Sequence, residues 1–157
     1  MCGITAVFNL DSKPINRKCL ELMTGLLCHR GPDAADLWVD RAVGLGHRRL
    51  SVIDLEGGAQ PMCSPDGRYV LSYNGEIFNY REVRQNLIER GVVFRTESDT
   101  EALLWSLILD GAASLSALNG QFAFVFYDTK ERVAVVARDR MGEKPLYYWH
   151  SDASFVI

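Results

Sequence analysis

The sequence predicts an α+β fold with antiparallel sheets, and the order of its segments supports this class. Runs typical of strands come first, helical segments follow, and further strand-like runs close the chain. The links between neighbouring strand-like runs have hairpin length, which favours antiparallel pairing over an array of parallel β-α-β units. The sequence contains neither an internal repeat nor a low-complexity segment.

The strands are predicted from short β-branched and apolar runs bounded by turn residues. In chain order these runs are residues 4–9, 37–39, 43–48, 69–73, 122–127, 133–137, 146–149 and 155–157. Asp128-Thr129-Lys130-Glu131 joins two of the strongest runs and is typical of a hairpin. The last two runs are expected to pair in the same way.

Three helices are predicted from apolar side chains at helical spacing and from residues typical of helix ends. The first covers residues 15–28, and a Gly-Pro loop follows it. The second covers residues 80–90 and stops at a glycine. The third has residues 102–109 as its apolar body, and Ser98 with Glu101 shows the spacing of a capping box at its start.

Length and composition are those of one globular domain. The chain has 157 residues, of which 48% are hydrophobic and 24% charged, and its net charge is -3. This balance gives no reason to expect a nucleic-acid or membrane partner. No apolar run reaches the roughly 20 residues needed to span a bilayer, and no signal peptide is recognisable.

The cysteines and the C-terminal residues give two further expectations. Cys2, Cys19, Cys28 and Cys63 form no CxxC pair and no metal-ligand spacing, so we expect no metal site and a reducing, cytoplasmic compartment. Residues 154–157 read as a strand without a following turn or polar tail. We therefore expect residues 1–157 to be one domain cut from a longer polypeptide.

Cys2 is the first candidate for chemistry. Once Met1 is removed, Cys2 carries both a thiol and a free α-amine, whose ordinary pKa values of about 8.5 and 7.7–8.0 lie near neutrality. A nucleophile activated by its own N-terminal amine is an established arrangement that needs no histidine partner. The alternative is a small buried thiol without function.

Two residue pairs extend this hypothesis. Asn74-Gly75 follows a predicted strand and is either a plain turn or a pair of oxyanion donors, the side-chain amide and the glycine N–H. Arg49 and Asp99 are each either a surface charge or a helix cap, or together they are a clamp for the carboxylate and ammonium of an amino acid. The sequence contains neither GxxxxGK[ST] nor GxGxxG, so we expect no ATP site by these routes.

Together these motifs resemble the class II glutamine amidotransferase domain, in particular the N-terminal glutaminase domain of glutamine-dependent asparagine synthetases. The resemblance extends over nearly the whole chain. The matching stretches are residues 1–4, 29–33, 46–54, 58–62, 73–80, 98–101, 118–124 and 138–148.

The resemblance implies an N-terminal nucleophile hydrolase fold, a four-layer αββα sandwich of two antiparallel sheets. It implies that Cys2 attacks the side-chain amide of glutamine, that Asn74 and Gly75 hold the oxyanion, and that water hydrolyses the resulting thioester. The substrate-binding residues implied are Arg49, Leu50, Ser51, Val52, Ile53, Asn74, Gly75, Glu76 and Asp99. No cofactor is expected in this domain.

The resemblance also implies a synthetase domain of the same polypeptide as partner. That domain would use ATP and Mg²⁺ to make asparagine from aspartate with the ammonia released here, and the whole protein could form a homodimer. Three alternatives stay open at this point: another amidation acceptor, a catalytically silent regulatory or docking domain, and an amidase for a different amide.

Overall fold

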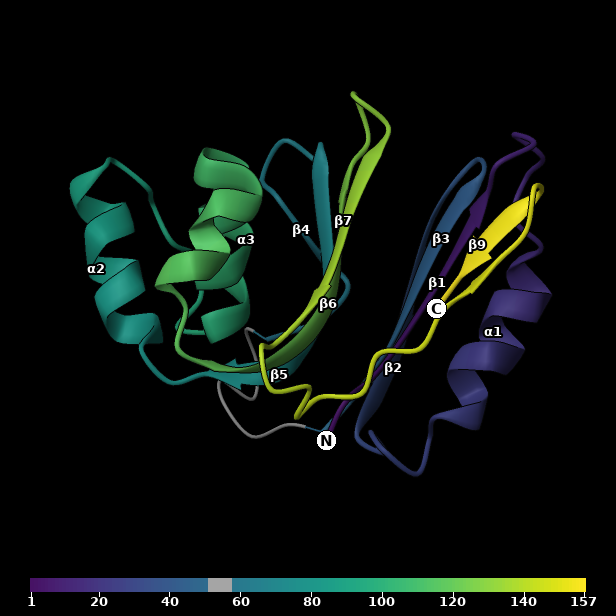
Figure 1. The fold of residues 1–157 in the computed structure, drawn as a ribbon, viewed down its shortest axis with the longest axis horizontal. Coiled ribbons are helices and arrows are strands. Elements are labelled where there is room, and N and C mark those ends of the chain that lie inside the picture. The colour runs from purple at the N-terminus through teal and green to yellow at the C-terminus, as the bar shows by residue number, and fades with distance from the viewer. Residues whose placement is uncertain (51–57) are drawn as a thin grey trace.

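Two antiparallel sheets face each other at the centre of the molecule, and helices cover their outer faces (Figure 1). The computed structural model describes residues 1–50 and 58–157. In spatial order the first sheet consists of β2 (Ala34–Asp40), β3 (Val43–Arg49), β1 (Gly3–Asn9), β9 (Ser154–Val156) and β8 (Trp149–His150). The second consists of β4 (Met62–Cys63), β5 (Tyr69–Ile77), β6 (Gly120–Asp128) and β7 (Val133–Arg138).

The helices complete the layers. α1 (Arg17–Leu26) lies on the outer face of the first sheet, whereas α2 (Tyr80–Glu89) and α3 (Asp99–Asp110) lie on the outer side of the second (Figure 1). A 3₁₀ helix, η1 (Gly111–Ala117), continues α3 toward β6. The layer order is therefore αββα, and the predicted sandwich is confirmed. No helix in the described part of the chain is long and apolar enough to cross a membrane.

The pleat of β6 divides the core into two parts, because successive side chains of a strand point to opposite faces. Phe122, Phe124 and Phe126 pack toward the helices, whereas Val125 and Tyr127 pack toward the first sheet. The same alternation on β5 turns even-numbered side chains toward the first sheet. Side chains on these inner faces therefore meet across the interface between the sheets.

β5 is longer than the sequence predicted, and this changes the interpretation of Asn74-Gly75. The expected strand ended at residue 73, but β5 pairs with β6 in unbroken register from Tyr69↔Asp128 to Ile77↔Gly120. Asn74 and Gly75 therefore lie inside a strand, and their interpretation as a turn is wrong. The ladder to β6 keeps the backbone extended although Asn-Gly favours a turn locally.

The start of α3 is confirmed in part. Ser98 is the N-cap, and its hydroxyl oxygen accepts a hydrogen bond from the N–H of Thr100 at 3.1 Å. The capping box is wrong in its second half, because the carboxylate of Glu101 accepts instead from the N–H of Arg95 and of Thr96. Glu101 therefore fixes the segment before α3, and Ser98 caps the helix.

Candidate active site

A cavity of about 230 Å³ opens where the N-terminus meets the ends of both sheets. In Figure 1 the N-terminus lies between the sheets, beside the end of β5 that leads to α2. The cavity is lined by Met1, Cys2, Arg49, Leu50, Gly58, Gln60, Tyr73, Asn74, Gly75, Glu76, Ser98, Asp99, Thr100 and Lys144.

Cys2 directly precedes β1 and borders this cavity. Its sulfur accepts a hydrogen bond from the N–H of Leu50 at 3.4 Å and lies 3.7 Å from the carbonyl oxygen of the same residue. The carbonyl oxygen of Cys2 accepts a hydrogen bond from Nε of Arg30 at 3.1 Å. The end of β3 and the loop after α1 thus hold the thiol, which is partly exposed to the cavity.

The Gly75 N–H points away from β6 and toward the cavity edge of β5. Its strand partner on β6, Phe122, bonds to Asp139 instead of to Gly75. The N–H of Phe122 donates to Oδ2 of Asp139 at 3.2 Å, and the carbonyl oxygen of Phe122 accepts from the backbone N–H of Asp139 at 2.7 Å. Alternate residues of an antiparallel strand direct their N–H groups to the same edge. Accordingly, Tyr73 donates to Gln60 Oε1 at 2.7 Å and Ile77 donates to Asp99 Oδ2 at 3.1 Å, one on each side of Gly75.

Asn74 places a second donor beside this N–H. Its side chain is only 4% exposed, and it lies on the face of β5 that is turned toward the first sheet. No hydrogen bond joins its amide to any residue within 1–50 or 58–157. The side-chain amide of Asn74 and the N–H of Gly75 are thus two donors bordering the cavity that Cys2 also borders, the arrangement that an oxyanion requires.

Asp99 forms a buried acidic end of the cavity. It lies in the first turn of α3, is 5% exposed, and its Oδ2 accepts a hydrogen bond from the Tyr73 hydroxyl at 2.7 Å. Burial raises the pKa of Asp99, and the hydrogen bonds from Tyr73 and from the N–H of Ile77 oppose that rise. A buried carboxylate bordering a cavity is suited to an ammonium group.

Arg49 gives the cavity a basic wall. It is the last residue of β3 and is 9% exposed, so the alternative of a surface charge is wrong for both Arg49 and Asp99. Its neighbour on the same inner face, His47, is 1% exposed, and its Nε2 lies 3.0 Å from the carbonyl oxygen of Tyr73. Burial, with a smaller effect from the charge of Arg49, lowers the pKa of His47 to about 4 against the opposing effect of the bond to Tyr73. His47 is therefore neutral at pH 7.

The structure brings most of the predicted site residues to one cavity. Those around it are Cys2, Arg49, Leu50, Asn74, Gly75, Glu76 and Asp99. Ser51, Val52 and Ile53 lie outside the described residues. Gln60, Tyr73 and Lys144 also line the cavity and were not predicted as site residues, although each lies in a stretch that carries the family resemblance. In the part of the chain that the structure describes, no three His, Cys, Asp or Glu side chains are grouped as metal ligands.

Comparison with known proteins agrees with this geometry. The sequence model of the glutamine amidotransferase domain family matches residues 1–157. The chain belongs to the glutamine amidotransferase domain family. This amidotransferase domain is 42% identical over 160 residues to glutamine-hydrolyzing asparagine synthetase 3 of Bacillus subtilis, covering 100% of this chain and 26% of that protein.

Further relatives give the same result. Asparagine synthetase B of Escherichia coli is 36% identical over 154 residues, which cover 97% of the amidotransferase domain and 27% of that protein. The domain thus spans about a quarter of the length of these curated relatives. Among solved structures, the glutamine phosphoribosylpyrophosphate amidotransferase of B. subtilis superposes with a TM-score of 0.76 over 99% of this chain and 41% of that one, at 21% identity. That similarity shows a shared fold.

Proposed function

We propose that this domain hydrolyses glutamine to glutamate and ammonia through a thioester on Cys2. The observation that carries the proposal is the meeting, around one cavity, of a thiol next to the N-terminus and two donors on β5 that have no hydrogen-bond partner among residues 1–50 and 58–157. A nucleophile with oxyanion donors is the machinery of acyl transfer. The charged residues around the same cavity suit an amino-acid substrate.

The reaction begins after Met1 has been removed. The α-amine of Cys2 accepts the thiol proton while the sulfur bonds to the side-chain carbonyl carbon of glutamine. The charge that develops on the carbonyl oxygen is stabilised by the amide of Asn74 and the N–H of Gly75. When the carbon–nitrogen bond breaks, the protonated amine of Cys2 returns its proton to the departing nitrogen, and ammonia leaves.

Hydrolysis of the thioester uses the same groups, with water as the nucleophile and the Cys2 sulfur as the leaving group. A water molecule attacks the thioester carbon, the α-amine accepts a proton from it, and the same two donors stabilise the second oxyanion. The carbon–sulfur bond then breaks, and the sulfur takes the proton back, releasing glutamate. The domain itself uses no cofactor in this scheme.

The ends of the substrate are recognised by opposite charges. Arg49 holds the α-carboxylate of glutamine, since a guanidinium pairs with a carboxylate in a fork. Asp99 and Glu76 hold the α-ammonium. Leu50 borders the same cavity and lines the site. A simple amide without an α-amino acid head would offer no carboxylate to Arg49 and no ammonium to Asp99, which disfavours an amidase for other substrates.

The ammonia passes to a synthetase domain of the same polypeptide. This step is proposed from the length of the relatives, of which the amidotransferase domain covers only about a quarter, and from their names as asparagine synthetases. We propose that the partner domain uses ATP and Mg²⁺ to make asparagine from aspartate. Free thiols at all four cysteines fit a cytoplasmic protein.

The test compares glutamine hydrolysis by the wild type, by Cys2→Ala and by Cys19→Ala, after intact mass has verified that Met1 is absent. The Cys2→Ala variant is expected to lose at least about 1,000-fold in kcat/KM, because the covalent pathway is lost with the thiol. Cys19 is exposed on α1, so its variant should match the wild type. Equal rates for wild type and Cys2→Ala would overturn the proposal, and a silent docking domain would show no hydrolysis in any of the three.

A further inference from the structure

The stretch 138–148 carries family resemblance, but the proposed reaction leaves it without a role. In the structure it forms a tightly held loop directly after β7. The carboxylate of Asp139 accepts hydrogen bonds from the N–H groups of Phe122, Met141, Glu143 and Lys144 at 2.9–3.2 Å. Burial raises the pKa of Asp139, but these donors outweigh burial and lower it below its usual range. The carboxylate therefore fixes the shape of this loop.

A second contact fixes the position of the loop on the domain. The guanidinium of Arg140 donates to the carbonyl oxygens of Leu115, Ser116 and Leu118 at the end of η1. The backbone reverses at Gly142, whose φ of +67° favours glycine. These contacts place the side chain of Lys144 at the cavity.

Lys144 presents a buried positive charge at the N-terminus of the protein. The residue is 7% exposed, and its Nζ contacts Met1 Sδ at 3.6 Å. Among residues 1–50 and 58–157 it has no carboxylate partner. Buried lysines are usually paired with an acid, so an ammonium whose side-chain contact among these described residues is a thioether is unusual. Met1 is bonded to the nitrogen that becomes the α-amine of Cys2 once Met1 is removed.

We propose that the charge of Lys144 keeps the α-amine of processed Cys2 unprotonated near neutral pH, so that the amine is ready to take the thiol proton. A neighbouring cation disfavours the protonated form of an amine, and the effect is strong where water is scarce. The inference rests on the proposed glutaminase function. Lys144 acts through Cys2 and is therefore a positioning residue in this scheme.

Other charged groups face the same region. Arg30 donates to the carbonyl oxygen of Cys2, and Arg49, Glu76 and Asp99 line the cavity. Glu76 and Asp99 are the proposed contacts of the substrate ammonium; in the free protein their charges oppose the effect of Lys144, and both are kept in every variant below. Arg30 and Arg49 act in the same direction as Lys144, but both are kept in the variants below, so a difference between variants isolates the lysine.

The experiment measures the pH dependence of kcat/KM for glutamine in processed wild type, Lys144→Met, Lys144→Arg and Lys130→Met. In Lys144→Met the acid limb of the kcat/KM profile should move to higher pH by about one unit, so that kcat/KM at pH 6.5 falls about tenfold. The plateau of kcat/KM at high pH should stay within threefold of the wild-type value. Lys144→Arg keeps the charge and should keep the wild-type midpoint. Lys130 is exposed on the hairpin between β6 and β7, and its variant is the matched control.

Two measurements that need no glutamine separate this inference from the proposed function. The pH midpoint of Cys2 alkylation by iodoacetamide, followed by mass spectrometry, should move with the kinetic midpoint. In ¹⁵N-cysteine-labelled wild type the α-amine should titrate below the about 7.7–8.0 of a free α-amino group, which keeps the test valid if Lys144→Met fails to fold.

The outcomes are distinct. An amine that titrates low in protein without glutaminase activity would overturn the proposed function but not the effect of Lys144 on the amine. Three results would overturn the role of Lys144. The pH midpoint of kcat/KM could be unchanged in Lys144→Met, or it could shift equally in Lys144→Arg. The third such result is an α-amine of Cys2 that titrates at or above the pKa of a free α-amino group. A rise in KM at every pH with unchanged midpoints would also overturn it, since it would make Lys144 a substrate contact.

Discussion

Nε2 of His47 donates a hydrogen bond to the carbonyl oxygen of Tyr73 at 3.0 Å, across the interface between the two sheets. One neighbouring bond also crosses this interface, from the hydroxyl of Ser72 to the carbonyl oxygen of Gly46. β3 pairs with β1, which follows the nucleophile, and β5 carries the oxyanion donors. These bonds therefore fix the distance between the thiol and its donors.

The buried, neutral His47 makes stability depend on pH. Its folded pKa of about 4 lies below the ordinary 6.5, so in this range the unfolded chain binds a proton that the folded protein does not. The free energy of unfolding should therefore decrease as the pH falls from 6.5 to 4, by about 3 kcal/mol. Urea unfolding of wild type and His47→Gln at several pH values measures this. The variant should lack this part of the pH dependence, whereas His150→Gln, which changes an exposed histidine, should retain it.

The hydroxyl of Tyr73 is predicted to support substrate binding through Asp99. Tyr73→Phe removes the 2.7 Å hydrogen bond that stabilises the buried carboxylate, so the site for the substrate ammonium is weakened. KM for glutamine should rise about tenfold with kcat within threefold, and the protein should lose about 1.5–3 kcal/mol of stability. Steady-state kinetics and urea unfolding measure the two effects. Tyr147→Phe, at a tyrosine that is 83% exposed, is the control. An unchanged KM in Tyr73→Phe would contradict the proposed role of Asp99.

Much of this site follows from local sequence patterns. Helical spacing and hairpin-length links predicted the elements, and the N-cap at Ser98 was predicted because a serine before an apolar helix satisfies orphan N–H groups. Cys2, Arg49 and Asp99 were selected by their chemistry, and their meeting around one cavity depends on long-range pairing that spacing alone does not encode.

Other features could not be predicted because they depend on tertiary contacts. Asn74-Gly75 has the local preference of a turn, and only the ladder to β6 shows that it is extended and that the Gly75 N–H points outward. Glu101 has capping-box spacing but bonds to the preceding loop. Lys144 was not predicted as a site residue, since its burial depends on the hydrogen bonds made by Asp139.

Gly31 is predicted to be essential for the position of β3. A Cβ built on Gly31 would lie 2.4 Å from the carbonyl carbon of Arg48 and 2.6 Å from the nitrogen of Arg49, and backbone cannot yield as a flexible side chain can. Gly31→Ala should therefore lose about 1–3 kcal/mol of stability and raise KM for glutamine by displacing Arg49. Gly25→Ala is the matched control, because a Cβ on Gly25 in α1 has no neighbour within 4 Å. Urea unfolding should show that this control gains about 0.5–1 kcal/mol. A wild-type KM and stability in Gly31→Ala would show that the loop accommodates a side chain.

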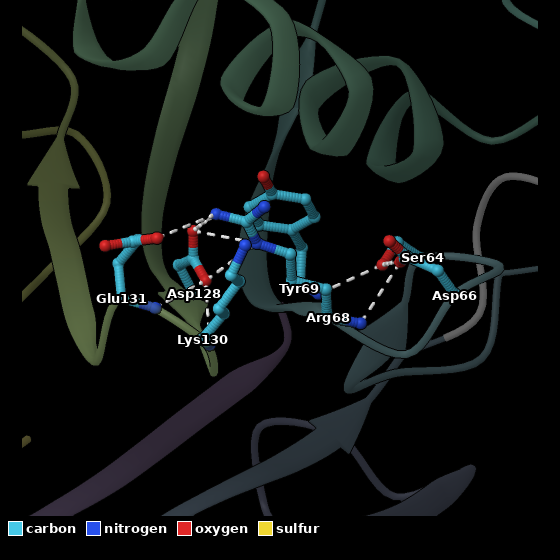
Figure 2. Close-up of polar contacts among 7 residues, drawn as sticks. All are labelled: Ser64, Asp66, Arg68, Tyr69, Asp128, Lys130 and Glu131. Atoms are coloured by element: carbon cyan, nitrogen blue, oxygen red, sulfur yellow. Dashed lines mark hydrogen bonds and ion pairs between the residues drawn. The ribbon is translucent and has the colours of Figure 1, made fainter.

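The ion pair between Arg68 and Asp128 is predicted to contribute stability without affecting the reaction. The two side chains bond through Nε and Nη2 of Arg68 at 2.7–3.2 Å (Figure 2). Arg68 directly precedes β5, whereas Asn74 lies in the second half of that strand. Arg68, followed by the backbone N–H groups of Glu131 and Lys130, lowers the pKa of Asp128 to about 2 against the effect of burial. Because the folded pKa is depressed, this stability is present above pH 3.8 and is lost as the pH falls toward 2.

Asp128→Asn tests this stabilisation. The variant should unfold more easily than wild type by about 1–2 kcal/mol at pH 7, and the difference should largely disappear near pH 2, as the wild-type carboxyl becomes protonated. The substitution is not expected to change kcat or KM for glutamine, since roughly six residues of an extended strand, about 20 Å, separate the ion pair from Asn74. Asp152→Asn alters an exposed carboxylate and is the control for the change in net charge. Urea unfolding at pH 7 and pH 2, with glutaminase assays at pH 7, measures both effects. A large fall in activity in Asp128→Asn would show that the two ends of β5 are coupled.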